Sequence, residues 1–126
     1  MPKIRANGIN LHYEEEGEGF PVVFLHGWPG DQAMWLFQIP VFSAHYRVTA
    51  PDIRGHGRSE KTNGGYDVKT LASDVSVMFE ELGIEEAFVV GGSFGGAVCQ
   101  RFVIDYPEKV RGAVWSIQRP FAQGTT

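Results

Sequence analysis

Ser93 is the residue of this sequence best suited to nucleophilic chemistry, because glycines stand on both sides of it. The sequence Gly91-Gly92-Ser93-Phe94-Gly95-Gly96 joins the apolar run 87–90 to a stretch with helical character. On a sharp turn from a strand into a helix, a serine hydroxyl is pushed clear of the sheet. Small residues two positions before and after it let the two backbones approach closely. The pattern therefore predicts Ser93 as a nucleophile and Gly91 and Gly95 as the glycines that permit the turn.

A nucleophilic serine also needs hydrogen-bond donors for the oxyanion that forms when it attacks a carbonyl group. The backbone N–H of Phe94, at the N-terminus of the following helix, is placed to donate to that oxygen. A glycine-rich turn between a strand and a helix can instead bind phosphate. That alternative is disfavoured, because neither G-x-G-x-x-G nor a Lys-Ser/Thr pair after the glycines is present.

A second motif, His26-Gly27-Trp28-Pro29-Gly30, begins at the end of the apolar run 21–26. Acyl transfer needs a second N–H donor, and we predict that the backbone of Trp28 supplies it. Gly27 leaves the backbone bare enough for a substrate to approach. For His26 we predict that the ring fixes the loop by hydrogen bonds, with a catalytic role as the alternative.

Turn, cap and periodicity signals predict that strands and helices alternate along the chain. Asn7-Gly8 predicts a hairpin turn, Asp67 caps an amphipathic helix, and Gly83 ends it. Pro40 is expected to interrupt a short helical stretch that Asp31 caps, and the helix after Ser93 is expected to be buried on most sides. The predicted strands are 3–6, 9–13, 21–26, 46–50, 87–90 and 110–117, and the predicted helices are 31–37, 67–82 and 95–106. Such an order requires right-handed crossovers and a mostly parallel sheet.

Three motifs together resemble the α/β-hydrolase family and occur in the family's order. They are the loop 26–30, the segment Pro51-Asp52-Ile53-Arg54-Gly55-His56-Gly57-Arg58-Ser59 and the turn 91–96. The resemblance covers residues 4–117. It implies an α/β fold in which an N-terminal β-hairpin leads into a mostly parallel sheet with flanking helices, with the C-terminal strands and helices missing.

The same resemblance implies roles for individual residues. Ser93 would be the nucleophile, and the N–H groups of Trp28 and Phe94 would form the oxyanion hole. The loop 52–59 would be mainly structural, with Asp52 stabilising a turn rather than serving as the catalytic acid.

Within the family, the residue at the tip of this turn sorts the chemistry. Epoxide hydrolases and haloalkane dehalogenases place Asp there, whereas Ser93 resembles the esterase, lactonase, carbon–carbon hydrolase and perhydrolase branches. Gly92 departs from the His common before the nucleophile in those branches. Gly-Gly-Ser also resembles proline iminopeptidases, but Trp28 stands where they usually carry a second Gly before Pro. The subclass therefore stays open.

A serine nucleophile needs a base and an acid that orients the base, and in this family both follow the serine in the chain. All four histidines precede Ser93, and only two acidic residues, Asp105 and Glu108, follow it. The histidines are His12, His26, His45 and His56. We therefore expect the chain by itself to be inactive or nearly so.

Composition excludes several other classes of protein. Hydrophobic residues make up 43 % and charged residues 21 % of the 126 residues, with a net charge of −4, which indicates a globular domain without a basic surface for nucleic acid. The single cysteine, Cys99, allows no intrachain disulfide. No apolar run approaches the roughly 18 residues of a membrane span. We expect a cytoplasmic protein that uses no metal and no organic cofactor.

Residues 1–117 are thus predicted to form a partial α/β-hydrolase domain and residues 118–126 an irregular tail. The predicted function is that of a serine hydrolase acting on a small ester, lactone or related acyl substrate, here as a truncated chain that lacks the triad His and acid. The alternative is a non-catalytic truncated pseudoenzyme or interaction module. Because the strand 110–117 would leave an open sheet edge, we expect self-association or binding of the missing C-terminal half there.

Overall fold

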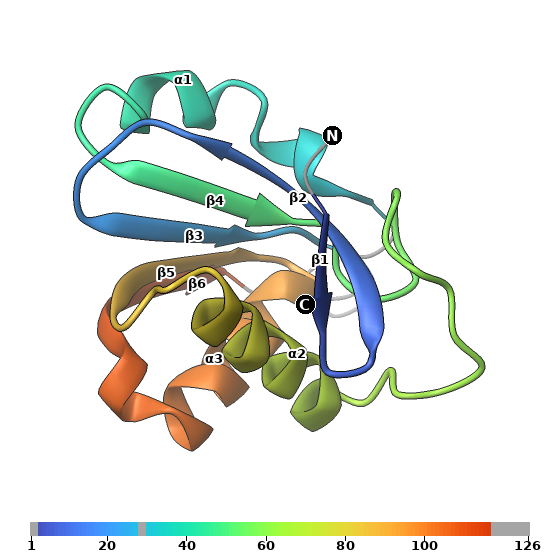
Figure 1. Ribbon diagram of the computed structural model, residues 1–126. Helices are drawn as coiled ribbons and strands as arrows, with labels where there is room; N and C mark the ends of the chain where they lie inside the picture. Colours follow the sequence, from blue (N-terminus) through green and yellow to red (C-terminus); the bar gives the residue numbers. More distant parts are fainter. Residues whose placement is uncertain (1–2, 28–29, 117–126) are drawn as a thin grey trace, which may run out of the picture.

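The computed structural model describes residues 3–27 and 30–116, which form one six-stranded sheet with helices on both of its faces (Figure 1). The predicted tail, residues 118–126, lies outside the described residues. The strands are β1 (Lys3–Ala6), β2 (Ile9–Glu16), β3 (Pro21–Leu25), β4 (Arg47–Pro51), β5 (Ala87–Gly92) and β6 (Val110–Ser116). The helices are α1 (Gln38–Phe42), α2 (Val68–Glu81) and α3 (Phe94–Asp105), with short 3₁₀ turns at Gln32–Trp35 and Pro107–Lys109.

The strands lie in the order β1-β2-β4-β3-β5-β6. The hairpin strands β1 and β2 pair antiparallel, β2 also pairs antiparallel with β4, and the other three pairings are parallel. The predicted fold class, a β-hairpin that leads into a mostly parallel sheet, is confirmed. The carboxyl ends of β3 and β5, which are neighbours, bring the two predicted motifs to the same edge of the sheet.

Local signals account for the hairpin and the long helix. Asn7 and Gly8 both have positive φ, 54° and 81°, as the tight hairpin turn requires. The Asp67 carboxylate accepts a hydrogen bond from the N–H of Thr70 at 3.0 Å and so caps α2. Gly83, with φ 69°, takes the left-handed conformation that ends the helix. The predictions for these three sites are confirmed.

The segment after β3 differs from its prediction. Asp31 does cap the 3₁₀ turn, accepting from the N–H of Ala33 at 2.9 Å. Pro40, however, does not interrupt a helix but lies inside α1. It occupies the first turn, where backbone N–H groups have no partner within the helix, so the missing N–H of proline does no harm.

The helix α3 also differs from its prediction on one side. Val98, Cys99 and Phe102 are fully buried, and the Phe102 ring packs on Phe79 of α2 with 5.0 Å between ring centroids. Ile104 is 63 % exposed, so the expectation of a helix buried on most sides is wrong there. Gln100 and Ile104 are the exposed residues of α3, so the sheet and α2 leave one narrow side of this helix uncovered.

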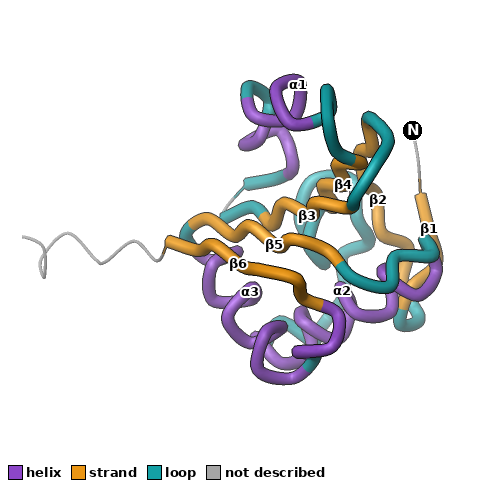
Figure 2. Tube along the Cα trace, turned by 90° about the vertical axis from the view of Figure 1, so that its left-hand side faces the viewer, coloured by secondary structure: helices purple, strands orange, loops and turns teal. Residues whose placement is uncertain are grey.

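The two faces of the sheet are covered unequally. Figure 2 shows α2 and α3 on one face and α1 on the other, where β5 and β6 are left uncovered. On that face Phe88 is 36 % and Val114 67 % exposed, and both line an apolar hollow of about 370 Å³ beside Phe42 of α1. Within the described residues, β6 is an edge strand, as predicted for 110–117.

Two features are absent from the described residues, 3–27 and 30–116. None of those helices is long and apolar enough to cross a lipid bilayer. No cluster of three or more histidine, cysteine or acidic side chains in those ranges could hold a metal ion.

Candidate active site

Ser93 alone forms the turn between the last residue of β5 and the first residue of α3. Its φ of 55° and ψ of −120° are a combination that residues with a side chain rarely adopt. Among the described non-glycine residues, only Asn7 shares a positive φ. The Ser93 side chain makes no capping hydrogen bond to α3. The strained turn predicted at this position is therefore present, and strain of this kind is concentrated at functional sites.

The glycines around Ser93 stand where backbones meet at close range. A side-chain carbon on Gly95 would overlap the carbonyl oxygens of Leu25, the last residue of β3, and of His26, which follows it. One on Gly91 would overlap the carbonyl of Gly95. Because the overlapping atoms belong to the backbone, they cannot rotate away. The same argument applies to Gly96 against a carbonyl of β6, a requirement that the sequence did not single out.

The end of β3 brings Gly27 directly against the turn. A side-chain carbon on Gly27 would lie 3.0 Å from the Ser93 Cβ and 3.5 Å from its Oγ. Phe94 is the first residue of α3, where backbone N–H groups point out of the N-terminal end of the helix. Trp28 lies outside the described residues, so its part in an oxyanion hole stays a prediction.

His26 is completely buried and hydrogen-bonded on both sides of its ring. The backbone N–H of Ile53 donates to Nε2 at 2.8 Å. Nδ1 lies 2.8 Å from the carbonyl oxygen of Gly27, and since Nε2 is an acceptor, Nδ1 carries the proton and donates to that oxygen. Burial lowers the pKa of His26 below its usual 6.5, which favours this neutral form.

Asp52 is fully engaged in holding two loops. One carboxylate oxygen accepts from the N–H of Gln32 at 2.7 Å and the other from the N–H of Arg58 at 3.1 Å. The Ser59 hydroxyl donates to the Asp52 backbone carbonyl at 2.5 Å. The side chain is nearly completely buried. These contacts match a turn-stabilising residue, as predicted.

The described histidines and the late acidic residues do not form a charge relay with Ser93. The His56 Nδ1 lies 2.9 Å from the Arg54 carbonyl oxygen, and the ring packs on His26 with 5.2 Å between centroids. Asp105 accepts from Arg101 at 2.9 Å at the far end of α3. Among the described residues, no histidine is hydrogen-bonded to the Ser93 hydroxyl.

Two neighbours of the turn were not assigned by the sequence. The space that a side chain at Gly92 would occupy is taken by Met34, whose Cε lies 2.7 Å from that position, and by Trp35, whose ring lies 3.3 Å from it. The Met34 sulfur also accepts a hydrogen bond from the N–H of Gly27 at 3.2 Å. The sequence does not connect them with the turn, because no local signal brings residues 34 and 92 together.

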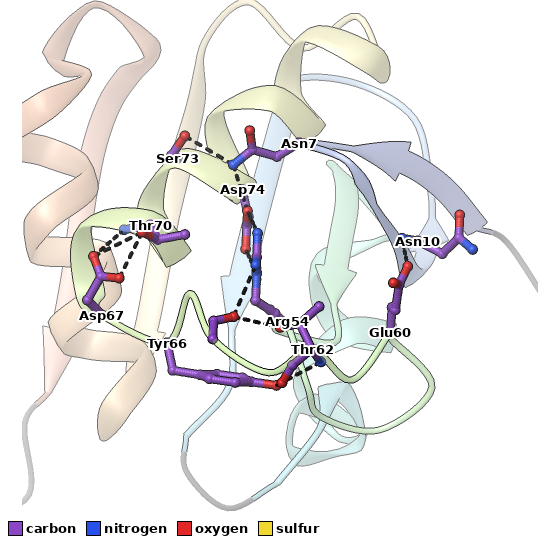
Figure 3. A network of polar contacts seen from close by, with 11 residues as sticks. Asn7, Asn10, Arg54, Glu60, Thr62, Tyr66, Asp67, Thr70, Ser73 and Asp74 are labelled. Atoms are coloured by element: carbon purple, nitrogen blue, oxygen red, sulfur yellow. Dashed lines mark hydrogen bonds and ion pairs between the residues drawn. The ribbon is translucent and has the colours of Figure 1, made fainter.

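A polar network fixes the long loop that carries Ile53 (Figure 3). The Arg54 guanidinium donates to both carboxylate oxygens of Asp74 on α2, each at 2.8 Å, and the pair is almost entirely buried. Asn7 of the hairpin donates to the same carboxylate at 2.8 Å. The signal in the sequence was an aspartate within the apolar face of α2, next to Val75.

Comparison with known proteins places this arrangement in a family. A family model described as "alpha/beta hydrolase fold" matches residues 21–118. The chain is 41 % identical over 99 residues to a soluble epoxide hydrolase of Corynebacterium sp. (strain C12). This match covers 79 % of this chain and 35 % of that protein. It is 43 % identical over 101 residues to a non-heme chloroperoxidase of Streptomyces lividans, covering 78 % of this chain and 37 % of that protein.

Solved structures agree with the sequence matches. The chain superposes with a TM-score of 0.87 on Est816, described as an N-acyl homoserine lactone degrading enzyme, at 35 % identity over 90 % of this chain and 44 % of that one. The epoxide hydrolase CorEH gives a TM-score of 0.89 at 33 % identity, over 96 % of this chain and 46 % of that one. The chain thus spans 35 % of the length of the first of these curated relatives. Its sequence, its sheet topology and its strained serine turn lead to one conclusion: the chain belongs to the alpha/beta hydrolase fold family.

Proposed function

We propose that this chain carries the nucleophile and the oxyanion-binding part of a serine hydrolase that acts on a small ester, lactone or related acyl compound. The observation that carries the proposal is the strained backbone of Ser93, held between β5 and α3 with Gly27 packed against it. The strain presents the hydroxyl at the edge of the sheet where the two motif loops meet.

The identity of the nucleophile separates acyl chemistry from epoxide chemistry. When a serine oxygen attacks a carbonyl carbon, the leaving group departs and an acyl ester remains, which water hydrolyses to release the acid and regenerate serine. If the same oxygen opened an epoxide, the product would be a serine ether, which water does not cleave under these conditions. A carboxylate nucleophile avoids that dead end, because its epoxide product is an ester. Ser93 therefore supports an acyl substrate, despite the sequence similarity to a soluble epoxide hydrolase.

The proposed oxyanion hole consists of the N–H groups of Phe94 and Trp28. Phe94 opens α3, so the positive end of the helix adds to the field that favours an oxyanion. His26 donates a hydrogen bond to the Gly27 carbonyl. In a trans peptide the N–H of the following residue points away from that carbonyl, so fixing the carbonyl also fixes the direction of the N–H. We propose that this clamp is how His26 and Gly27 support the second donor.

The chain alone is proposed to be inactive or nearly so. Without a base, a serine hydroxyl is a weak nucleophile near neutral pH. Oxyanion binding by itself leaves a residual acceleration of about 10³–10⁴ over water in enzymes whose triad has been removed. A non-catalytic binding role is the second candidate, supported by the lack of any hydrogen bond between Ser93 and a histidine among the described residues.

An organophosphonate probe tests the proposal. We expect slow labelling of Ser93, mapped by mass spectrometry, that imidazole added as an external base accelerates. The variant Ser93→Ala should lose the label, while Ser43→Ala, at a serine that bonds the Pro40 carbonyl, should keep it. Fast stoichiometric labelling without imidazole would show that a base is already in place. No labelling of Ser93 even with imidazole would favour the non-catalytic role.

A further inference from the structure

Met34 connects two residues that hold Ser93 in place. Its sulfur accepts a hydrogen bond from the N–H of Gly27 at 3.2 Å. Its methyl end lies 2.7 Å from where a side-chain carbon on Gly92 would be. Gly27 packs on Ser93 through space, and Gly92 precedes it in the chain. Met34 therefore contacts residues on both sides of the turn.

Met34 is also one of the residues that solvent can reach. It is 47 % exposed, whereas Met78 in α2 is completely buried. Oxidation of a thioether to a sulfoxide follows exposure. The one cysteine, Cys99, does not compete as a site of oxidation, because burial raises the pKa of its thiol to about 11 and keeps it protonated.

We propose that Met34 is a reversible oxidation site for peroxides, and that the oxidation state of its sulfur sets the position of the Gly27 amide beside Ser93. One oxygen atom of hydrogen peroxide is transferred to the Met34 sulfur, the O–O bond breaks, and the other oxygen leaves as water. The sulfur is oxidised by two electrons and the peroxide is reduced by two. Reduction of the sulfoxide by a methionine sulfoxide reductase restores the thioether.

The consequence follows from the change of acceptor. A thioether sulfur is a weak acceptor, whereas a sulfoxide presents a polar oxygen that lies beyond the sulfur. The Gly27 N–H must either follow that oxygen or lose its partner. In both cases the hydrogen bond that fixes the Gly27 amide beside Ser93 is lost or changed. The oxidation itself does not depend on the proposed hydrolase function. Only an effect on the chemistry of Ser93 rests on that function.

The site of oxidation can be tested on the native chain. Trypsin cleaves at Arg47, so Met34 and Met78 fall in different peptides, and each can be quantified by mass spectrometry. When dilute hydrogen peroxide is added to the folded protein, we expect Met34 to oxidise about tenfold faster than Met78. In urea the two rates should become similar. Equal rates in the folded protein would overturn the proposal.

The coupling to the turn is tested by the amide signal of Gly27 in a ¹H–¹⁵N spectrum. We expect peroxide to shift that signal and methionine sulfoxide reductase to restore it. Met34→Leu should abolish the peroxide effect and speed hydrogen exchange at the Gly27 amide, whereas Met78→Leu should leave the effect intact. If Met34→Leu does not fold, reversal by the reductase still tests the native chain. A Gly27 signal that oxidation of Met34 leaves unchanged would overturn the proposal, whatever the outcome of the Ser93 labelling.

Discussion

The backbone N–H of Ile53 donates to Nε2 of His26 at 2.8 Å, and this bond determines which ring nitrogen of His26 carries the proton. The proton is left on Nδ1, which donates to the Gly27 carbonyl. Neutral His26 therefore links Ile53, in the long loop after β4, to Gly27, the residue that packs on Ser93. Protonation of Nε2 would break the bond to Ile53.

This relationship predicts a pH dependence of stability. The pKa of His26 is lowered in the folded state by burial, so the unfolded chain binds this proton more readily. The contribution of His26 is present above its ordinary pKa of 6.5 and is lost as the pH falls below that value towards the lower pKa of the folded state. The free energy of unfolding, measured by urea denaturation at several pH values, should fall over this window.

The matched variants for this prediction are His26→Gln and His45→Gln, because His45 lies on the surface. His26→Gln should lower stability overall and flatten the dependence below pH 6.5. His45→Gln should keep the wild-type dependence. An unchanged slope in His26→Gln would show that other groups cause the acid sensitivity.

Ser93→Gly should stabilise the fold. Glycine adopts the φ of 55° without strain, and relief of about 1–3 kcal/mol outweighs the roughly 0.4–1 kcal/mol by which glycine favours the unfolded chain. Asn7→Gly is the control, since asparagine tolerates a φ of 54° in a hairpin turn and gains little from the change. The measurement is the melting temperature of each variant relative to the unsubstituted chain. A destabilised Ser93→Gly would mean that the turn is not strained.

Gly95→Ala should destabilise the protein strongly. The added carbon would overlap the carbonyl oxygens of Leu25 and His26, so α3 must move away from β3, at a cost of about 1–3 kcal/mol or more. Gly64→Ala is the matched control, because nothing lies within 4 Å of its added carbon. Urea denaturation should show a large loss for the first variant and little change for the second. Equal stabilities would contradict the close approach of α3 to β3.

Asp74→Ala should be among the most destabilising substitutions of a charged residue. It leaves the guanidinium of Arg54, which is 11 % exposed, without its partner, and such losses amount to about 3–5 kcal/mol. The control is Glu86→Ala, which removes the partner of the exposed Arg111 and should be nearly neutral. The stabilities of the two variants are compared by the denaturant concentration at which half of each protein is unfolded. A mild effect of Asp74→Ala would show that the loop does not depend on this pair.

The uncovered sheet face predicts self-association of the isolated chain. Val114 lines the apolar hollow beside Phe88, and surfaces of this kind favour contacts between molecules. Sedimentation velocity should show a mass that rises with concentration, and Val114→Lys should reduce that rise. Ile104→Lys, on the opposite side at similar exposure, should have no such effect. A monomer at every concentration would exclude association through this face.

Much of the fold could be predicted because its signals are local. The Asn7-Gly8 turn, the Asp67 cap and the end of α2 at Gly83 depend on the conformations of a few adjacent residues, and all three were confirmed. The prediction for Pro40 was wrong because the effect of a proline depends on its distance from the start of the helix, and α1 begins at Gln38, only two residues earlier. Ile104 was misjudged because periodicity reports the apolar positions of a helix, not which of them a neighbouring element covers.

The sequence by itself determined the family, the strand-to-helix turn at Ser93 and the lack of any histidine after it, because each is a matter of residue type and short spacing. The tertiary structure alone decided which distant residues meet at that turn. It placed Met34 against Gly92, the N–H of Ile53 on His26, and Asp74 on Arg54. Those contacts join segments 20 or more residues apart. They are set by the packing of strands and helices around one sheet, which no local pattern encodes.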